Sequence, residues 1–379
     1  MKPVCVKKTS DFGCKSQQTP HKTLLNNSLT LSFMGSDFHP GPVSKVFPLP
    51  FLPSGVSTLC EYSLSFPQRH FRLRVMTFPT SMKQIPDFAP NPAGLRMHLY
   101  APASLPLAPP LVVALHGCLQ AADVYARETG WNALADRYGF VVLYPEQTAQ
   151  NHERHCFRWW EPAHQQADEG EPASIRAMIH YAQAAYDIDP HRIYVTGLSA
   201  GGCMTATLLA TSPALFAAGA ILSAAPYGAA GSLEEALLTM QGGVSHPAAE
   251  WARRVQAQNP GFAGPYPRVA LFQGAQDEVV SPQNLAALTA QWTYLHGLNP
   301  EDGAPMPGLA GYPEVTGVAY GHPGQPPVVV SYLIEPLGHA LAVHPGPGPR
   351  QGGATGTFAV DVGFYSAWWV ADFFGLTDR

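Results

Sequence analysis

The feature that most constrains the fold is a regular alternation of apolar, β-branched runs with helical patterns, which begins near residue 90. Several runs are apolar along their whole length, as expected for strands that helices cover on both faces of a mostly parallel sheet. The predicted strands cover residues 95–102, 110–117, 140–145, 192–197, 217–224, 268–274 and 328–336. The predicted helices cover residues 122–139, 171–187, 202–213, 284–297 and 362–375. This order predicts an α/β domain with a mostly parallel central sheet and helices on both faces, in which ligands bind beyond the carboxyl ends of the strands.

The first 82 residues differ from the rest of the chain in composition. All seven lysines lie before residue 84, and this segment shows little apolar periodicity. Such a shift predicts a boundary, with an irregular N-terminal extension over residues 1–82 and the α/β domain over residues 83–379. The extension is either disordered or loosely docked, or it precedes a true translation start at Met76 or Met82. Basic residues open the chain, but no clean apolar segment with a small-residue cleavage site follows them, so no clear signal peptide is visible.

Composition excludes several classes of protein. The chain is 46% hydrophobic and 13% charged, with a formal net charge of −5. These values indicate a globular protein and argue against a disordered chain or a basic nucleic-acid binder. No apolar run reaches the roughly 18 residues that a membrane-spanning helix needs, so no transmembrane segment is expected. The oligomeric state does not follow from the sequence.

The stretch VTGLSAGG, residues 195–202, places Ser199 between a predicted strand and a predicted helix. The spacing G-x-S-x-G at such a junction is typical of a sharp turn that projects a nucleophilic serine. Glycine is needed at positions 197 and 201 because side chains there would clash in so tight a turn. The N-terminus of the following helix would direct the N–H of Ala200 toward an oxyanion. A plain turn of small residues is the alternative.

A serine hydroxyl needs a base, and the base needs an acid that orients it. In enzymes that carry such a serine nucleophile on an α/β sheet, the acid and the histidine follow the serine in chain order, each after a later strand. Asp277 follows the predicted strand 268–274, with Glu278 as the second choice, and His339 follows the strand 328–336. We therefore expect Ser199, Asp277 and His339 to form a catalytic triad. His344 lies in a loop rich in glycine and proline and is expected at the surface or at the rim.

A second oxyanion donor is expected after the early strand 110–117. His116, Gly117 and Cys118 follow it directly. Gly117 would let the backbone turn so that nearby amides face the site, and the N–H of Cys118 is the favoured donor. His116 would shape this loop by hydrogen bonding, and a buried histidine in an ordinary turn is the alternative for it.

In this order, the blocks LHGCLQ, CFRWW, GEPASI, YVTGLSAGGCM and GHA resemble the polyhydroxybutyrate depolymerase-type esterases, a branch of the α/β-hydrolase superfamily. The resemblance covers roughly residues 90 to 375. It implies Ser199 as nucleophile, Asp277 as acid, His339 as base and His116 as the histidine of the oxyanion loop. After His339 the chain departs from the family pattern, because ALAVHPGPGP stands where relatives often carry a tryptophan and glycines. That departure concerns the substrate pocket and leaves the triad in place.

The same resemblance implies a disulfide between Cys118 and Cys156, since cysteines at these places are often bridged in relatives; two buried thiols are the alternative. Cys203 is expected to be a small packed side chain. Trp159 and Trp160 either line the substrate cleft or pack in the core. No cysteine shows metal-binding spacing, and the implied chemistry needs neither metal nor cofactor. Export from the cell is favoured by the resemblance, although the N-terminus shows no signal for it.

The sequence therefore predicts a serine ester hydrolase that cleaves hydroxyalkanoate esters, such as 3-hydroxybutyrate oligomers or polymer, through an acyl-enzyme. Its expected partner is a polyester, an oligoester or a small ester. A carbohydrate esterase of the feruloyl or acetyl-xylan type is the alternative with the same chemistry. A non-catalytic binding protein on a hydrolase scaffold is the alternative from another class.

Overall fold

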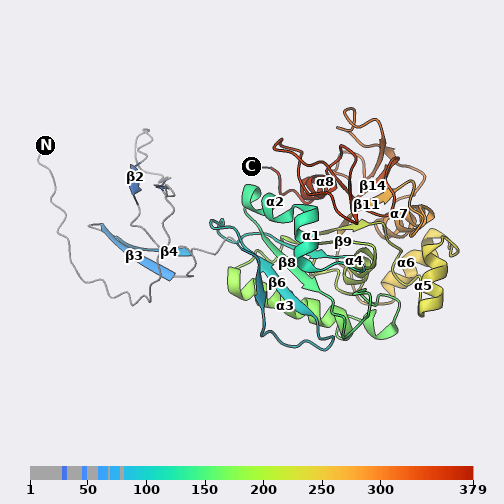
Figure 1. The fold of residues 1–379 in the computed structure, drawn as a ribbon, viewed down its shortest axis with the longest axis horizontal. Coiled ribbons are helices and arrows are strands. Elements are labelled where there is room, and N and C mark those ends of the chain that lie inside the picture. Colours follow the sequence, from blue (N-terminus) through green and yellow to red (C-terminus); the bar gives the residue numbers. More distant parts are fainter. Residues whose placement is uncertain (1–27, 32–44, 49–58, 67–68, 77–80, 379) are drawn as a thin grey trace, which may run out of the picture. The chain divides into compact units, whose positions relative to one another are not determined.

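One sheet organises the larger of the two units into which the chain divides, residues 56–379 (Figure 1). Within the described residues of the computed structural model this sheet has ten strands. In spatial order they are β12 (Ala304–Pro305), β13 (Val315–Tyr320), β14 (Val329–Ile334), β11 (Arg268–Gly274), β10 (Ala218–Leu222), β9 (Ile193–Leu198), β7 (Leu111–Leu115), β8 (Val141–Glu146), β6 (Arg96–Tyr100) and β5 (Lys83–Ile85). The six strands from β14 to β8 run parallel, and the pairs at both edges are antiparallel.

The structure describes residues 28–31, 45–48, 59–66, 69–76 and 81–378. In the smaller unit, residues 1–55, β1 (Ser28–Leu31) pairs antiparallel with β2 (Lys45–Pro48). In the larger unit, two further pairs join β3 (Leu59–Phe66) to β4 (Arg69–Met76) and β15 (Leu341–Val343) to β16 (Ala359–Asp361). Most of residues 1–80 lie outside the described residues, as do Cys5 and Cys14. The expected boundary after residue 82 and the expected translation start therefore stay predictions.

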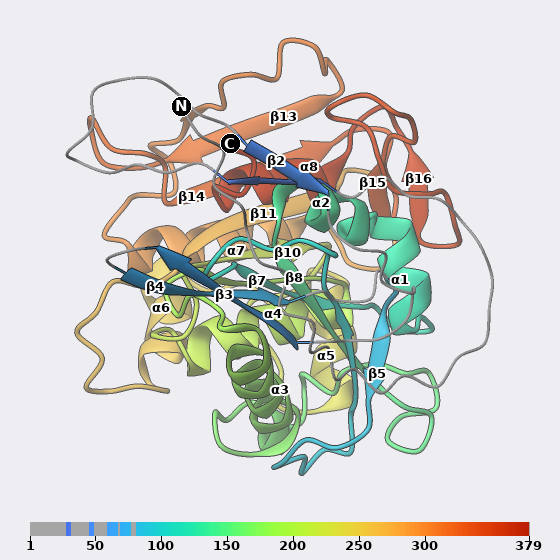
Figure 2. The ribbon, with the colours of Figure 1, turned by 90° about the vertical axis from the view of Figure 1, so that its left-hand side faces the viewer.

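Helices cover both faces of the sheet, and Figures 1 and 2 show α3 and α8 on opposite sides of it. One face carries α3 (Gly170–Tyr186), α4 (Ala200–Thr211), α5 (Leu233–Met240), α6 (Ala248–Gln256) and α7 (Gln283–Leu295). The other carries α1 (Ala122–Thr129), α2 (Trp131–Tyr138) and α8 (Ser366–Phe373). A short 3-10 helix, η1, covers Pro162–His164.

Two apolar cores result, one on each side of the sheet. Successive side chains of a strand point to opposite faces, and in β7 Val113 belongs to one core while Val112 and Ala114 belong to the other. Every residue of β7, β8, β9 and β10 is buried, which explains why these strands are mostly apolar. The prediction of a mostly parallel sheet covered on both faces is thus confirmed.

Local sequence signals explain several helix ends. Gly130 and Gly139 adopt positive φ angles of 70° and 66° and end α1 and α2, so the helix predicted over 122–139 is in fact two helices. At the start of α5 the Ser232 hydroxyl accepts the N–H of Glu235 at 3.2 Å, which is a standard N-cap. The helices α5, α6 and η1 and the strands β1 to β5, β12, β13, β15 and β16 were not predicted.

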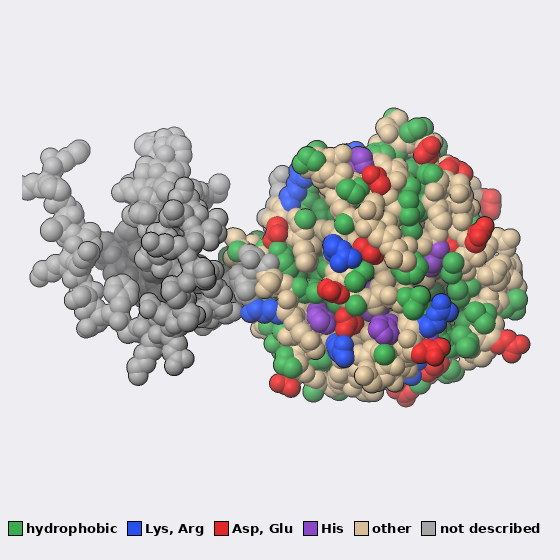
Figure 3. Space-filling model, viewed as in Figure 1, with side chains coloured by type: hydrophobic (Ala, Val, Ile, Leu, Met, Phe, Trp, Pro, Cys, Tyr) green, Lys and Arg blue, Asp and Glu red, His purple; other side chains and the backbone are tan. Residues whose placement is uncertain are grey.

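On the face shown in Figure 3, basic and acidic side chains are interspersed with apolar and neutral ones. Among the described residues, no helix is long and apolar enough to cross a membrane.

Candidate functional site

Ser199 lies in the turn between β9 and α4, with φ 57° and ψ −121°. This conformation is rare for a residue with a side chain, and two glycines make room for it. A Cβ on Gly197 would lie 2.4 Å from the backbone of Gly201, and a Cβ on Gly201 would lie 2.3 Å from the carbonyl oxygen of Leu115. The turn therefore requires glycine at positions 197 and 201 for steric reasons, which explains the G-x-S-x-G spacing.

Ser199, His339 and Asp277 are joined in one line of hydrogen bonds. His339 follows β14 and Asp277 follows β11, so both lie at the same end of the sheet as Ser199. His339 Nε2 lies 2.9 Å from Ser199 Oγ, and His339 Nδ1 lies 2.8 Å from Asp277 Oδ2. The structure thus brings together the three side chains that the sequence singled out.

The environment of Asp277 keeps its carboxylate ionised. Burial alone would raise its pKa, but the hydrogen bond and charge of His339 and the N–H groups of Val280 and Val279 outweigh that effect, so the pKa lies below its usual range. Those two N–H groups donate to Oδ1 at 2.8 and 2.9 Å. An ionised carboxylate only accepts hydrogen bonds, so Nδ1 of His339 carries the proton and Nε2 is left to accept the Ser199 hydroxyl.

Gln273 is a site residue that sequence reasoning missed. Its side chain, on β11, is buried and donates to Asp277 Oδ2 at 3.0 Å and to the carbonyl of Val280 at 3.0 Å. It therefore holds the same carboxylate oxygen that faces His339. A polar residue after the apolar run Val269–Phe272, four positions before the acid, was the signal that could have identified it.

Two amides next to Ser199 are available to a ligand. Within the described part of the chain, the N–H groups of Cys118 and Ala200 have no hydrogen-bond acceptor. The N–H of Gly117 is different, because it donates to Gln120 Oε1 at 2.9 Å. Of the residues expected in the oxyanion hole, Cys118 and Ala200 thus have free N–H donors. The N–H of Gly117 is already used, and this residue forms part of the turn instead.

Both ring nitrogens of His116 form hydrogen bonds with backbone groups. Nε2 accepts the N–H of Gln147 at 3.0 Å, so Nδ1 carries the proton and donates to the carbonyl of Gly117 at 2.7 Å. Burial lowers its pKa to about 4, which keeps the ring neutral near pH 7. These contacts hold the turn after β7, and they fit both the loop-shaping histidine and its alternative, a buried histidine in an ordinary turn.

The loop after β7 is tied to the loop that contains the CFRWW block. A disulfide joins Cys118 to Cys156, with the two Cα atoms 4.3 Å apart. The N–H of Leu119 adds a bond of 2.7 Å to the carbonyl of Arg154. Trp159 and Trp160 are 6% and 8% exposed and pack in one core. Their place along a substrate cleft stays a prediction.

A buried carboxylate supports this second loop. Glu171 has no exposed surface and accepts the backbone N–H of Arg158 at 2.8 Å, the Arg158 Nε at 3.2 Å and Gln147 Nε2 at 2.5 Å. Burial raises its pKa to about 7 against these donors. Gln147 in turn donates its N–H to His116, so the network reaches the loop beside Ser199. Sequence reasoning quoted GEPASI as a motif but assigned this glutamate no role.

Three further features concern Cys203, groups that could bind a metal ion, and His344. Cys203 is a buried free thiol, as expected, and burial raises the pKa of the Cys203 thiol to about 12. Among the described residues, no group of three or more histidine, cysteine or acidic side chains is arranged to hold a metal ion. His344, expected at the surface or rim, is partly exposed and lies near a separate cavity described below.

Comparison with known proteins identifies relatives that are named as esterases or depolymerases. A family model described as Esterase PHB depolymerase matches residues 95–311. Poly(3-hydroxyalkanoate) depolymerase C of Paucimonas lemoignei is 35% identical over 320 residues, which are 84% of this chain and 76% of that protein. Feruloyl esterase B of Talaromyces funiculosus is 33% identical over 64% of this chain and 69% of its own. Among solved structures, the acetyl xylan esterase from Aspergillus awamori superposes with a TM-score of 0.63 at 27% identity, covering 68% of this chain and 94% of its own.

Proposed function

The chain belongs to the esterase PHB depolymerase family and hydrolyses esters, and we propose that it does so with Ser199 as nucleophile, His339 as base and Asp277 as the orienting acid. The observation that carries this assignment is the position of His339, whose two ring nitrogens lie 2.9 and 2.8 Å from the serine and the aspartate. As the hydroxyl attacks the ester carbonyl, Nε2 takes its proton. Asp277 stabilises the imidazolium that forms.

Attack places a negative charge on the carbonyl oxygen. The free N–H groups of Ala200 and Cys118 are the donors that we assign to this oxyanion, with the N-terminal end of α4 adding its dipole. His339 then gives its proton to the departing alcohol. In the second half-reaction the same base activates water, which releases the acid and restores Ser199.

The proposed substrates are hydroxyalkanoate esters, as oligomers or as polymer. The support is the Paucimonas lemoignei relative, because its similarity extends over 84% of this chain. An ester of a plant cell-wall carbohydrate is the second candidate. It is favoured by the feruloyl esterase relative and by the superposition on an acetyl xylan esterase.

The Ser199→Ala variant tests the assignment. We expect it to fold as the wild type does and to lose catalysis of 3-hydroxybutyrate trimer by roughly 10⁴-fold or more, because the acyl-enzyme cannot form. Release of titratable acid from the trimer, and clearing of a polymer suspension, are the two readouts. A feruloyl ester and an acetylated xylan are assayed in parallel.

Ser212→Ala is the matched control. Ser212 follows the other end of α4, and its hydroxyl has no partner among the described residues. This variant should keep full activity. Activity that survives in Ser199→Ala would overturn the assignment, whereas serine-dependent cleavage of the carbohydrate esters alone would select the second candidate.

A further inference from the structure

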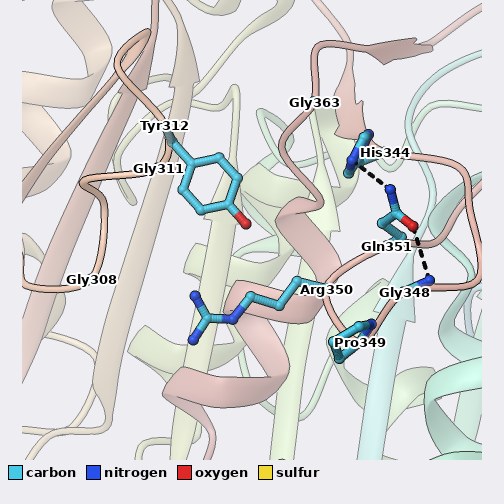
Figure 4. Close-up of a pocket in the computed structure, with 9 residues that line it drawn as sticks. All are labelled: Gly308, Gly311, Tyr312, His344, Gly348, Pro349, Arg350, Gln351 and Gly363. Atoms are coloured by element: carbon cyan, nitrogen blue, oxygen red, sulfur yellow. Dashed lines mark hydrogen bonds between the residues drawn. The ribbon is translucent and has the colours of Figure 1, made fainter.

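A cavity of about 590 Å³ opens beside α8 (Figure 4). Ser199, Asp277 and His339 do not line it. Three separate segments form its wall, residues 308–312, residues 344–351 and Gly363. Four of the lining residues are glycines, so much of the wall is bare backbone. The charged side chain in the wall is that of Arg350, and none of the described residues that line the cavity carries a carboxylate.

Two walls of the cavity connect through the chain to the carboxyl end of β14, while the carbonyl of Pro349 accepts the Arg137 guanidinium from the last turn of α2. Tyr312 precedes β13, whose first residue, Val315, pairs with Ile334 at the carboxyl end of β14. His339 follows that same end of β14. His344 is only five residues beyond His339, so their Cα atoms lie within about 18 Å of each other. This short stretch of chain links the triad to the wall of the cavity at His344.

Arg350 is presented by a loop whose geometry is fixed. Asp361 accepts His344 Nδ1 at 3.4 Å, and His344 Nε2 accepts the side-chain amide of Gln351 at 2.8 Å. Gln351 Oε1 accepts the N–H of Gly348 at 2.9 Å. A pair of backbone hydrogen bonds between residues 344 and 352 closes the loop. These hydrogen bonds therefore fix the position of the loop that carries Arg350.

The guanidinium of Arg350 stacks on aromatic rings and has no anionic partner. Its Cζ lies 4.4 Å from the ring centre of Trp368 and 5.3 Å from that of Trp369. No hydrogen bond or ion pair of this side chain occurs within the described residues. Asp361, the carboxylate beside the loop, is already used by His344 and the N–H of Gly363. Stacking holds the plane of a guanidinium while its N–H edge stays free for a planar anion.

We propose that this cavity binds the free carboxylate at the end of a hydroxyalkanoate oligomer, with Arg350 as its main ligand. The inference rests on the proposed function, because each hydrolysis of such an ester leaves a chain that ends in a carboxylate. A carboxylate matches the two parallel N–H groups of a guanidinium edge. Figure 4 shows the Tyr312 hydroxyl pointing into the cavity from the opposite wall, where it can donate a further hydrogen bond. The glycine-lined wall leaves room for the chain that carries the carboxylate.

The first test compares 3-hydroxybutyrate trimer as the free acid with its methyl ester. We expect the wild type to favour the acid, and Arg350→Gln to lower the acid-to-ester ratio of kcat/KM by about tenfold through a higher KM for the acid. Arg350→Lys should restore part of the preference, because it keeps the charge but loses the fork. Tyr312→Phe should lower the ratio less. Arg253→Gln, which removes an exposed arginine from α6, is the matched control and should leave the ratio unchanged.

The second test does not depend on turnover. In the Ser199→Ala background, calorimetry measures the Kd of the trimer acid with Arg350 present and with Arg350→Gln, and the expected result is about tenfold weaker binding in the second protein. Equal Kd values, or an acid-to-ester ratio that Arg350→Gln does not change, would overturn the proposal. If the wild type cleaves neither trimer, the proposed function fails, and the binding comparison still decides whether the cavity takes a carboxylate.

Discussion

At the scale of single residues, Ser199 shows how the site is held. Its N–H donates to the carbonyl of Leu222, and its own carbonyl accepts the N–H of Cys203, both at 2.9 Å. One bond fixes the residue to the end of β10 and the other to α4. A backbone in this region costs about 1–3 kcal/mol and persists only where its surroundings hold it in place. The direction of the hydroxyl is therefore set by two neighbouring elements of the core.

The pH dependence of stability should report Asp277. Its pKa in the folded protein lies below the value of about 3.9 for an unfolded chain. Its carboxylate therefore stabilises the fold above that value, and the contribution is lost as the pH falls through the lower folded pKa. We expect Asp277→Asn to be less stable than the wild type at pH 7, with a difference that shrinks below about pH 4.

Urea unfolding of both proteins from pH 7 to pH 3 measures this difference. Asp168→Asn is the matched control, because Asp168 is an exposed carboxylate whose ion-pair partner among the described residues is Arg176 alone. Its effect should be small across the range. A difference between wild type and Asp277→Asn that does not change with pH would contradict the linkage.

The triad could be predicted because each member directly follows an apolar strand and therefore comes to the same edge of the sheet. The supporting residues could not be predicted in that way. Gln273 lies inside a strand and Glu171 inside the first turn of a helix, and their roles depend on partners distant in the sequence or across a turn. Residue type and spacing carry no information about which buried donor a buried acceptor will meet.

At the scale of elements, the connection between the loop after β7 and the loop of Arg154–Trp160 has a measurable consequence. The disulfide Cys118–Cys156 closes a loop of 38 residues. In the chain-entropy account, a loop of this length stabilises the fold by about 4 kcal/mol. We expect a reductant to lower the free energy of unfolding of the wild type by an amount of this order. Esterase activity should fall as well, because Cys118 also carries a free N–H beside Ser199.

A variant with both Cys118→Ser and Cys156→Ser is the control for this experiment. It should show the lower stability from the start and should not respond to the reductant. A wild-type protein whose unfolding midpoint is the same with and without the reductant would contradict the expectation.

The elements that sequence reasoning missed are those with mixed surroundings. Helix α5 exposes Leu233, Leu237 and Leu238 while only two of its residues are buried, so it lacks a clear apolar stripe toward the core. Strand β13 forms an edge pair and has few fully buried positions, so its pattern is weaker than that of the parallel strands. The fully buried parallel strands β7, β8, β9 and β10 had the strongest signal and were all predicted, whereas the buried strand β15 is only three residues long and was missed.

At the scale of the whole molecule, the described cores and the site lie within one part of the chain. The buried residues of both cores begin at Ala93, and the sheet begins with β5 at Lys83. We therefore expect a chain that starts at Met76 to match the full chain in esterase activity and in the midpoint of thermal unfolding. Lower activity on soluble trimer would show that residues 1–75 contribute to the site.

A chain that starts at Ala93 is the matched comparison. It loses β5, which pairs with β6 along Lys83–Ile85, and it removes Phe88 from its contact with the core. Unpaired strand edges and exposed apolar surface lower stability and promote aggregation. This shorter chain should therefore unfold at a lower temperature than the chain that starts at Met76.

The common direction of the parallel strands also has a practical side. Since Ser199, Asp277 and His339 all follow carboxyl ends, the segments that enter the strands lie at the far end of the sheet, among them residues 101–110 before β7 and residues 187–192 before β9. These two segments touch through the bond from the Asp189 N–H to the carbonyl of Pro109, and Leu107 is 98% exposed. A resin or electrode coupled at position 107 would hold every molecule in the same orientation, with its reactive side facing the liquid.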